Sequence, residues 1–175
     1  MLTTRLPIQV EPYRLAASGE RLEGAMSLDK MARLREETGE QHGDVDVRLE
    51  FGQDAQGRRF IEGWLKASLR LACKRCLEPL PVDVESHFLL GMATSDTTAA
   101  ELPNAYEPVL VENEQLDLQS MLEDELILSL PQVVYHDEAE CPVSPDQLSS
   151  GEPLDPSEQP AASPFDVLRT LKKKH

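Results

Sequence analysis

Strict alternation of apolar and polar residues over three consecutive segments is the feature that most constrains this fold. Residues 44–51, DVDVRLEF, place Val, Val, Leu and Phe at every second position, and residues 60–72 and 82–90 continue the pattern. Because successive side chains of a strand point to opposite faces, each segment is predicted to be a half-buried strand. We therefore predict an antiparallel meander at the centre of the fold. The pattern leaves strand order and closure into a barrel open.

A helix over residues 117–130 is predicted to pack against this sheet. Asp117 is suited to cap its N-terminus, and Pro131 ends it. Apolar residues recur at three- and four-residue spacing and form one stripe: Leu118, Met121, Leu122 and Leu126. Glu123, Asp124 and Glu125 have no Lys or Arg four residues away to pair with. We expect a helix that is half core and half acidic surface, and an α+β fold class.

The remaining segments divide the chain into three parts. Residues 1–141 form the domain, with a first strand at 5–10, a helix from Ser27 to Gly39, a loop at 94–104 and a short strand at 109–111. Residues 142–162 are rich in Pro, Ser, Glu and Asp and read as a disordered acidic linker. Residues 163–175 are predicted to form a short docking helix, whose apolar face carries Phe165, Leu168 and Leu171.

Negative charge is concentrated in one part of the chain. The net charge is −15, and residues 91–160 contain sixteen Asp and Glu without one Lys or Arg. Such a surface repels phosphate backbones and attracts a basic protein. The alternative is that the charge serves solubility alone.

Several classes of protein are excluded by composition. No apolar run approaches the roughly 18–20 residues that span a bilayer, and the N-terminus lacks the apolar core of a signal peptide. Three cysteines, an odd number, do not make a secreted disulfide framework. We expect a cytoplasmic protein with no membrane association.

Two pairs of metal-ligating residues lie about sixty positions apart. Cys73 and Cys76 form a Cys-x2-Cys loop between two predicted strands, and His136 and Cys141 follow the 117–130 helix. Together they would complete a tetrahedral Cys3His zinc site that fixes the segment after the helix to the sheet. The alternative is two buried cysteines beside an exposed His and Cys, with no metal.

No constellation typical of catalysis is present in the sequence. There is no glycine-rich phosphate loop, nucleophile elbow or His-Glu-x2-His motif. The three consecutive acids at 123–125 point about 100° apart on a helix, so they cannot converge on one substrate atom. A thioredoxin-like dithiol requires a helix after the first cysteine, and Pro79 and Pro81 prevent one. We predict that the chain is not an enzyme.

A row of basic residues follows the central strands and is a candidate contact for RNA. Without interleaved aromatic residues it is a weak nucleic-acid signal, and such rows are usually the solvated side of a sheet. Its members are Arg58, Arg59, Lys66, Arg70, Lys74 and Arg75.

Several of these motifs occur in the order found in the bacterial YceD family, also called DUF177, which the chain resembles from Leu6-Pro7 to the basic tail. The matching pieces are Cys73-Lys74-Arg75-Cys76, the LPNAYEP segment at 102–108, the helix with Glu123, Asp124 and Glu125 up to Pro131, His136 and Cys141, and the SPFDVL segment at 163–168. Ser163 stands where relatives often have Asn, and both residues cap helices.

The resemblance implies a role in the accumulation of 23S ribosomal RNA, meaning its synthesis, processing or stability during large-subunit assembly. It implies no catalytic residue. Together with the acidic charge, it leads to the hypothesis that the chain binds a basic ribosomal or assembly protein through Asp117, Glu123, Asp124 and Glu125, and docks through Phe165, Leu168 and Leu171. Direct binding of 23S rRNA or a large-subunit precursor by the basic row, and an RNA-processing enzyme, are the alternatives.

Overall fold

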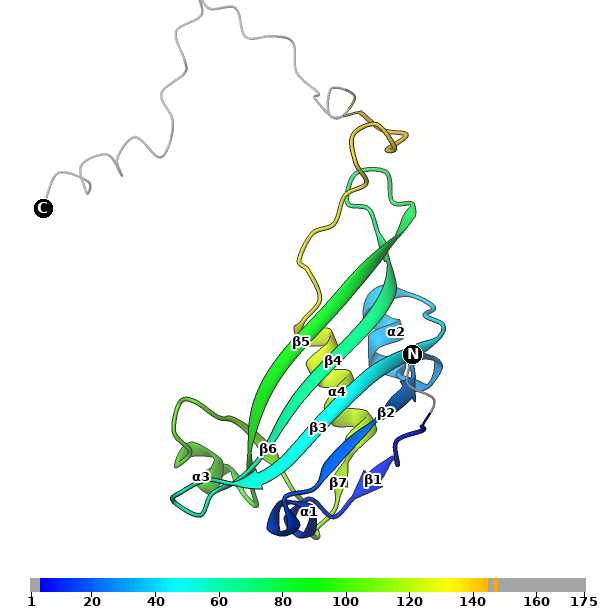
Figure 1. Cartoon of the computed structure of the whole chain (residues 1–175). Coiled ribbons are helices and arrows are strands. Elements are labelled where there is room, and N and C mark those ends of the chain that lie inside the picture. The colour runs from blue at the N-terminus through cyan, green and yellow to red at the C-terminus, as the bar shows by residue number, and fades with distance from the viewer. Residues whose placement is uncertain (1–3, 145–146, 148–175) are drawn as a thin grey trace, which may run out of the picture. The chain divides into compact units, whose positions relative to one another are not determined.

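A five-stranded sheet is the largest element of the structure, a computed structural model that describes residues 4–144 and 147. All named helices and strands lie within one compact unit, Met1–Cys141 (Figure 1). The predicted linker and C-terminal helix, with Phe165, Leu168 and Leu171, lie outside the described residues. None of the described helices has the length and apolarity needed to cross a membrane.

The sheet has the strand order β2-β3-β4-β5-β6. Its core is the predicted meander of β3 (Asp44–Gln53), β4 (Arg59–Ala72) and β5 (Pro79–Ala93), each antiparallel to the next. β2 (Arg21–Ser27) adds antiparallel to β3, and β6 (Glu107–Leu110) adds parallel to β5. The α+β class and the central strands are confirmed. The sheet is open, because β2 and β6 occupy opposite edges rather than pairing into a barrel.

Alternation buries one face of this sheet. Val45, Val47 and Leu49 on β3 are at most 1% exposed. Gly63 of β4 stands opposite Phe88 of β5, and a Cβ at Gly63 would lie 2.1 Å from the Phe88 ring. Glycine is therefore required there, since the aromatic ring lies directly over the backbone of the neighbouring strand.

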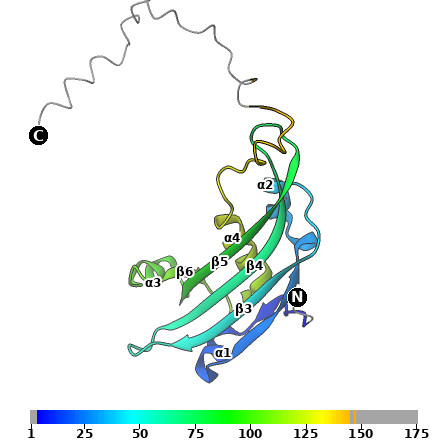
Figure 2. The same cartoon turned by 45° about the horizontal axis from the view of Figure 1, so that its top comes forward.

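Helix α4 (Leu118–Leu128) covers the buried face, as Figures 1 and 2 show. Leu118, Leu122 and Leu126 are fully buried, as their spacing predicted. The predicted N-cap is confirmed, because the Asp117 carboxylate accepts the Ser120 N–H at 2.8 Å. A two-stranded sheet of β1 (Gln9–Val10) and β7 (Leu116–Asp117) leads into the helix.

The structure corrects three local predictions and adds two elements that were not predicted. The strand expected at 5–10 shortens to β1, and the helix expected from Ser27 is instead a 3-10 turn, Leu28–Lys30, followed by α2 (Ala32–Thr38). The 94–104 segment contains a short helix, α3 (Asp96–Ala100). Helix α1 (Pro12–Ser18) and strand β2 were not predicted. In β2 the residues Gly24, Ala25 and Met26 are all buried, so the strand has no alternation to read.

Candidate metal centre and the acidic helix

The tight turn between β4 and β5 holds the first pair of candidate metal ligands. Cys73 follows the last residue of β4 and is fully buried. Its N–H donates to the Glu78 carbonyl at 2.9 Å, and its carbonyl accepts the Leu77 N–H at 2.9 Å. Leu77 closes the turn with a φ of 64°, in the left-handed region. This geometry turns the chain so that Cys76 faces back toward Cys73.

The segment after α4 brings the second pair to the same place. The Lys74 N–H donates to the Val134 carbonyl at 2.9 Å, and the Arg75 guanidinium donates to the His136 carbonyl at 2.9 Å. Arg75 also lies over the Tyr135 ring, 5.6 Å from its centroid. These contacts hold residues 134–136 against the β4–β5 turn, although sixty positions separate them in sequence.

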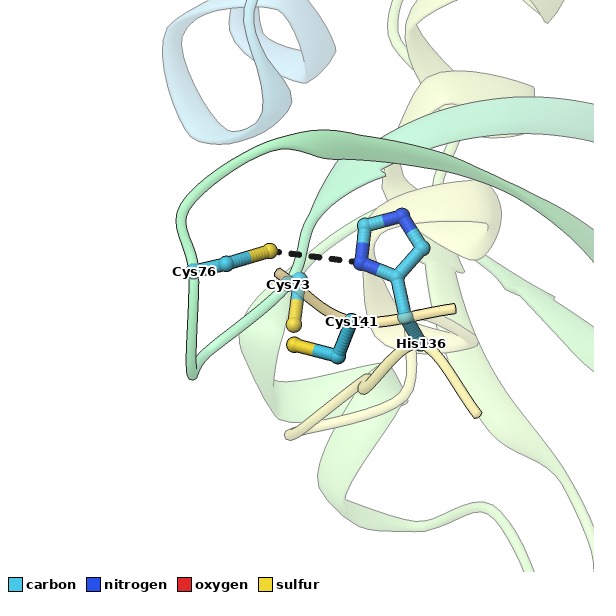
Figure 3. A group of neighbouring side chains, drawn as sticks. All are labelled: Cys73, Cys76, His136 and Cys141. Atoms are coloured by element: carbon cyan, nitrogen blue, oxygen red, sulfur yellow. Dashed lines mark hydrogen bonds between the residues drawn. The ribbon is translucent and has the colours of Figure 1, made fainter. Parts of the chain in front are cut away.

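A second small turn then returns Cys141 to His136. The Glu140 and Cys141 N–H groups both donate to the Asp137 carbonyl at 3.0 Å. The sulfur atoms of Cys73, Cys76 and Cys141 and a ring nitrogen of His136 lie within 4.8 Å of one another (Figure 3). Cys76 Sγ lies 3.3 Å from His136 Nδ1. The predicted convergence of the two pairs is confirmed, and the three cysteines are free thiols.

The surroundings of Cys73 favour a thiolate. Burial alone would raise the pKa of its thiol, but the backbone N–H groups of Cys76, His136 and Arg75 donate toward the sulfur and hold its pKa at about 5. Burial and the neighbouring thiols of Cys73 and Cys141 raise the pKa of Cys76. A set of three crowded sulfurs, one of them stabilised as an anion, with one imidazole is the donor set of a structural zinc site.

Glu123 of α4 has a structural role that its sequence position does not reveal. Its side chain is 6% exposed, and its carboxylate accepts the N–H groups of Arg33 at 2.7 Å and Leu34 at 3.0 Å. These groups belong to the first turn of α2, whose N-cap residue, Met31, provides no side-chain acceptor. Glu123 therefore caps α2 from another helix and satisfies donors that would otherwise be buried without partners.

The neighbouring acids differ from Glu123 and from each other. The Asp124 side chain is 54% exposed and forms an ion pair with Arg33, which also pairs with Glu123. Glu125 is 8% exposed, and no hydrogen bond or ion pair reaches its carboxylate from the described residues. Burial, with the negative charges of Glu107 and Asp124, raises the pKa of Glu125 to about 7.

The prediction that Glu123, Asp124 and Glu125 together form a solvated acidic surface is therefore wrong for two of the three. Asp124 remains on the surface, as does Asp117. As predicted, α4 itself provides no Lys or Arg to pair with these acids. Arg33, about ninety residues earlier in the chain, nevertheless forms ion pairs with Glu123 and Asp124.

The predicted basic row is divided among separate places. Arg58 and Arg59 lie at the start of β4, where Arg58 pairs with Asp54 at 2.7 Å and Arg59 lies over the Tyr13 ring. Arg70 lies eleven residues further along the same strand, about 36 Å away at the rise of an extended chain. Lys74 and Arg75 belong to the turn beside the cysteines, and Lys66 pairs with Glu85 at 2.5 Å. The six residues do not form one patch.

One exposed aromatic pair was not predicted. Trp64 lies on the solvated face of β4, is 36% exposed, and stacks on His87 of β5 with ring centroids 4.9 Å apart. Arg48 of β3 stands opposite Trp64 and pairs with Glu23. The alternation in residues 60–72 already assigned position 64 to the outer face, so Trp64 could have been found from the sequence.

Comparison with known proteins identifies relatives along almost the whole chain. Residues 61–172 match the family model described as large ribosomal RNA subunit accumulation protein YceD. A protein of that name from Haemophilus influenzae is 32% identical over 176 residues, which cover 99% of this chain and 100% of the relative. No solved structure matches the chain.

Proposed function

The chain belongs to the YceD family, and from this we propose that it acts in ribosome biogenesis by promoting the accumulation of large-subunit ribosomal RNA. The family name describes an accumulation factor rather than an enzyme, which agrees with the lack of a catalytic motif in the sequence. Accumulation covers synthesis, processing and stability of 23S rRNA, and we place this role in the cytoplasm.

The proposed mechanism is recognition of a basic ribosomal or assembly protein. It is carried by the one-sided charge of the chain: residues 91–160 contain no Lys or Arg, and this span includes α4. Asp117 and Asp124 are exposed on that helix, where Asp124 also pairs with Arg33, and Glu125 is a further, buried carboxylate of the helix. Glu123 contributes by holding α2 against α4. Phe165, Leu168 and Leu171 are proposed as a second, apolar contact with the partner or with the domain.

Capture of the partner from cells at increasing salt tests this mechanism. Asp117→Ser keeps an N-cap while it removes the charge, so we combine it with Asp124→Ser. The matched control replaces Glu36 and Glu40, two exposed acids on and just after α2, by Ser. We expect basic large-subunit proteins to bind the wild-type chain at low salt and to bind the Asp117/Asp124 variant at least tenfold more weakly. Equal binding by both variants would contradict a role for α4.

We further propose that Cys73, Cys76, His136 and Cys141 bind one structural zinc ion. All four ligand atoms face one centre, and their spacing of at most 4.8 Å approaches the edge of about 3.8 Å expected for a tetrahedron with Zn–S bonds near 2.3 Å. The ion would offset two of the three negative charges of the thiolates and join residues 136–141 to the β4–β5 turn. It would thereby fix the chain that leaves α4, and no reaction is assigned to it.

A second candidate function, direct RNA binding, is favoured by the exposed Trp64–His87 pair with Arg48 and Lys66 beside it. Nucleic-acid bases stack on such aromatic faces, and the two cations could contact phosphates if they left their ion pairs with Glu23 and Glu85. A gel shift with 23S precursor fragments at physiological salt would distinguish the two. We expect no shift if the partner is a protein, whereas a shift lost in Trp64→Ala would favour RNA.

A further inference from the structure

The outer edge of β6 borders an open groove whose other wall is α4. The groove has a volume of about 620 Å³, and its lining includes Leu110 of β6, Asp117 at the start of α4, and Ser120, Met121 and Asp124 of α4. β6 is the last strand of the sheet, and no further strand pairs with it among residues 4–144. The groove therefore lies along an uncovered sheet edge.

The groove exists because a hairpin starts to form and then opens. The chain turns at Asn113 and Glu114, both with positive φ, and Glu112 and Gln115 form one antiparallel bridge. Beyond that bridge β7 leaves β6 and pairs with β1, where Asp117 stands opposite Gln9. The position next to β6 that β7 would have continued to fill is left open.

Backbone groups of β6 point into this open position. The Val111 N–H donates to the Ala93 carbonyl of β5 at 2.8 Å. In a parallel pair, alternate residues direct both backbone groups to the same neighbour, so Val109 and Val111 face β5. The N–H and C=O of Leu110 and the C=O of Pro108 consequently face the groove. Leu110 is 46% exposed, as expected for a residue on an open edge.

The charged residues that line the groove are all acidic. They are Glu112, Asp117 and Asp124, and no described Lys or Arg is part of the lining, although Arg33 of α2 pairs with Asp124 and donates to the Ser120 carbonyl. Glu107 of β6 is exposed and lies close enough to Glu125 to repel its charge. Glu125 follows Met121 by one helical turn and is more than nine-tenths buried without a counter-ion among the described residues. A buried carboxylate without a counter-ion is costly, but Glu125 and Glu107 do not line the groove. The acids that a cation in the groove would meet are Glu112, Asp117 and Asp124.

We propose that this groove binds an extended, basic segment of the partner protein, which adds as a strand beside β6 and directs Lys or Arg side chains at alternate positions toward the acids that line the groove, Glu112, Asp117 and Asp124. The backbone of Leu110 would supply the hydrogen bonds, and the carboxylates would select the charge. Alternation follows because residues i and i+2 of a strand face the same side. This inference rests on the proposed function and names where and how that partner is recognised.

Fluorescein-labelled octapeptides serve as probes for the unidentified segment. One alternates Arg and Val, and a second contains four Arg followed by four Val, so that charge and composition are equal. We expect the alternating peptide to bind the full chain at least tenfold more tightly in fluorescence anisotropy. Two modified forms of the alternating peptide test the strand pairing: one is N-methylated on every Arg and the other on every Val. Only one of these two sets of N–H groups faces β6, so one modified peptide should lose binding and the other should keep it.

Variants of the chain locate the binding site. Ser120→Arg places bulk and positive charge in the groove from an exposed helix position, and Ser68→Arg makes the same change on the outer face of β4. We expect only Ser120→Arg to weaken binding of the alternating peptide, by at least tenfold. Asp124→Asn should also weaken it, and Glu36→Gln should not.

The outcomes separate this inference from the proposed function. If the two peptides bound equally and Ser120→Arg and Ser68→Arg had equal effects, the groove would not be the binding site. Capture of basic proteins from cells would then still support the proposed function. A chain that captures no basic protein would overturn the function itself. A second copy of the chain in the groove would appear as a dimer lost in Ser120→Arg, and would overturn the basic occupant.

Discussion

The cysteine cluster and the acidic residues of α4 are close in sequence, since Cys141 follows Glu123 by fewer than twenty residues. The sequence predicted the arrangement of the cysteine cluster correctly, but it did not predict the environments of the three acids. The four candidate metal ligands were considered as one possible site across sixty positions, and their ligand atoms do lie together. The three consecutive acids were predicted to share one environment, and they occupy three: a buried cap, an exposed ion pair and a buried carboxylate that no group among residues 4–144 bonds to.

The difference lies in what each residue type requires. Thiols and imidazole at short spacing have a narrow chemistry, so two such pairs in one chain predict a shared centre. A carboxylate can be solvated, paired, or used as a cap, and the choice depends on which backbone or side chain arrives from elsewhere. Arg33 and the first turn of α2 decide it here, and neither is visible from the local sequence of α4.

Loss of a metal ligand is expected to produce the largest effect. His136→Ala removes the one nitrogen ligand, and zinc content measured by elemental analysis on untagged protein should fall from about one ion per chain to near zero. A ligand present at about 1000 times its dissociation constant stabilises a fold by about 4 kcal/mol, so thermal unfolding should shift down in this variant and in wild-type protein treated with a strong chelator.

His42→Ala is the matched control for that experiment. His42 is exposed, pairs with Asp29 and is not one of the four candidate metal ligands. We expect it to keep its zinc and to unfold within a few degrees of the wild type, because exposed ion pairs contribute at most about 1 kcal/mol. Metal-free wild-type protein would remove the zinc proposal and leave the cluster as packed thiols.

Substitution of Glu123 should have the second largest effect. Glu123→Ala leaves the N–H groups of Arg33 and Leu34 without their acceptor inside the interface of α2 and α4. We expect a loss of about 2 to 3 kcal/mol in the free energy of unfolding, measured by urea denaturation.

Asp124→Ala removes a carboxylate from the adjacent position of the same helix and tests the contrast directly. Asp124 is half exposed, so its loss should cost no more than about 1 kcal/mol. If both variants lost the same stability, Glu123 would be one more surface charge, and the cap on α2 would carry no energy.

The same contrast between local and distant information explains which parts of the fold were predictable. β3, β4 and β5 each have one buried and one exposed face, so apolar and polar residues alternate along their own sequences. β2 pairs along its whole length with β3, but its buried run of Gly24, Ala25 and Met26 follows from the approach of residues 4–6 on its other side. The helix expected from Ser27 has helical residues, yet β2 extends to Ser27 because Asp44 is there to pair with it.

The candidate site divides in the same way. Spacing alone identified Cys73, Cys76, His136 and Cys141. The turn that holds Cys73 and Cys76 depends on Leu77 in a left-handed conformation. Such a conformation is usually adopted by glycine, so the leucine gave no indication of it in the sequence. The groove beside β6 was not predictable, since it depends on β7 leaving one hairpin partner for another.

Substitution of Glu125 is expected to change stability by an amount that depends on pH. Its pKa is raised from 4.5 to about 7 by burial and by the charges of Glu107 and Asp124, so between these values the folded chain holds a proton that the unfolded chain has released. Its protonated form therefore stabilises the fold fully below pH 4.5, and that contribution is lost as the pH rises through 7. The full pKa difference corresponds to about 3 kcal/mol at pH 8, and screening by solvent reduces it. Glu125→Gln, which stays neutral, should therefore be more stable than the wild type by about 1 to 2 kcal/mol at pH 8, and the advantage should vanish near pH 4.5. Urea denaturation across this range measures it, with Glu36→Gln as an exposed control that should track the wild type. An advantage of Glu125→Gln that did not change with pH would mean that Glu125 keeps an ordinary pKa, and that the carboxylate beside the groove is as well solvated as Asp124.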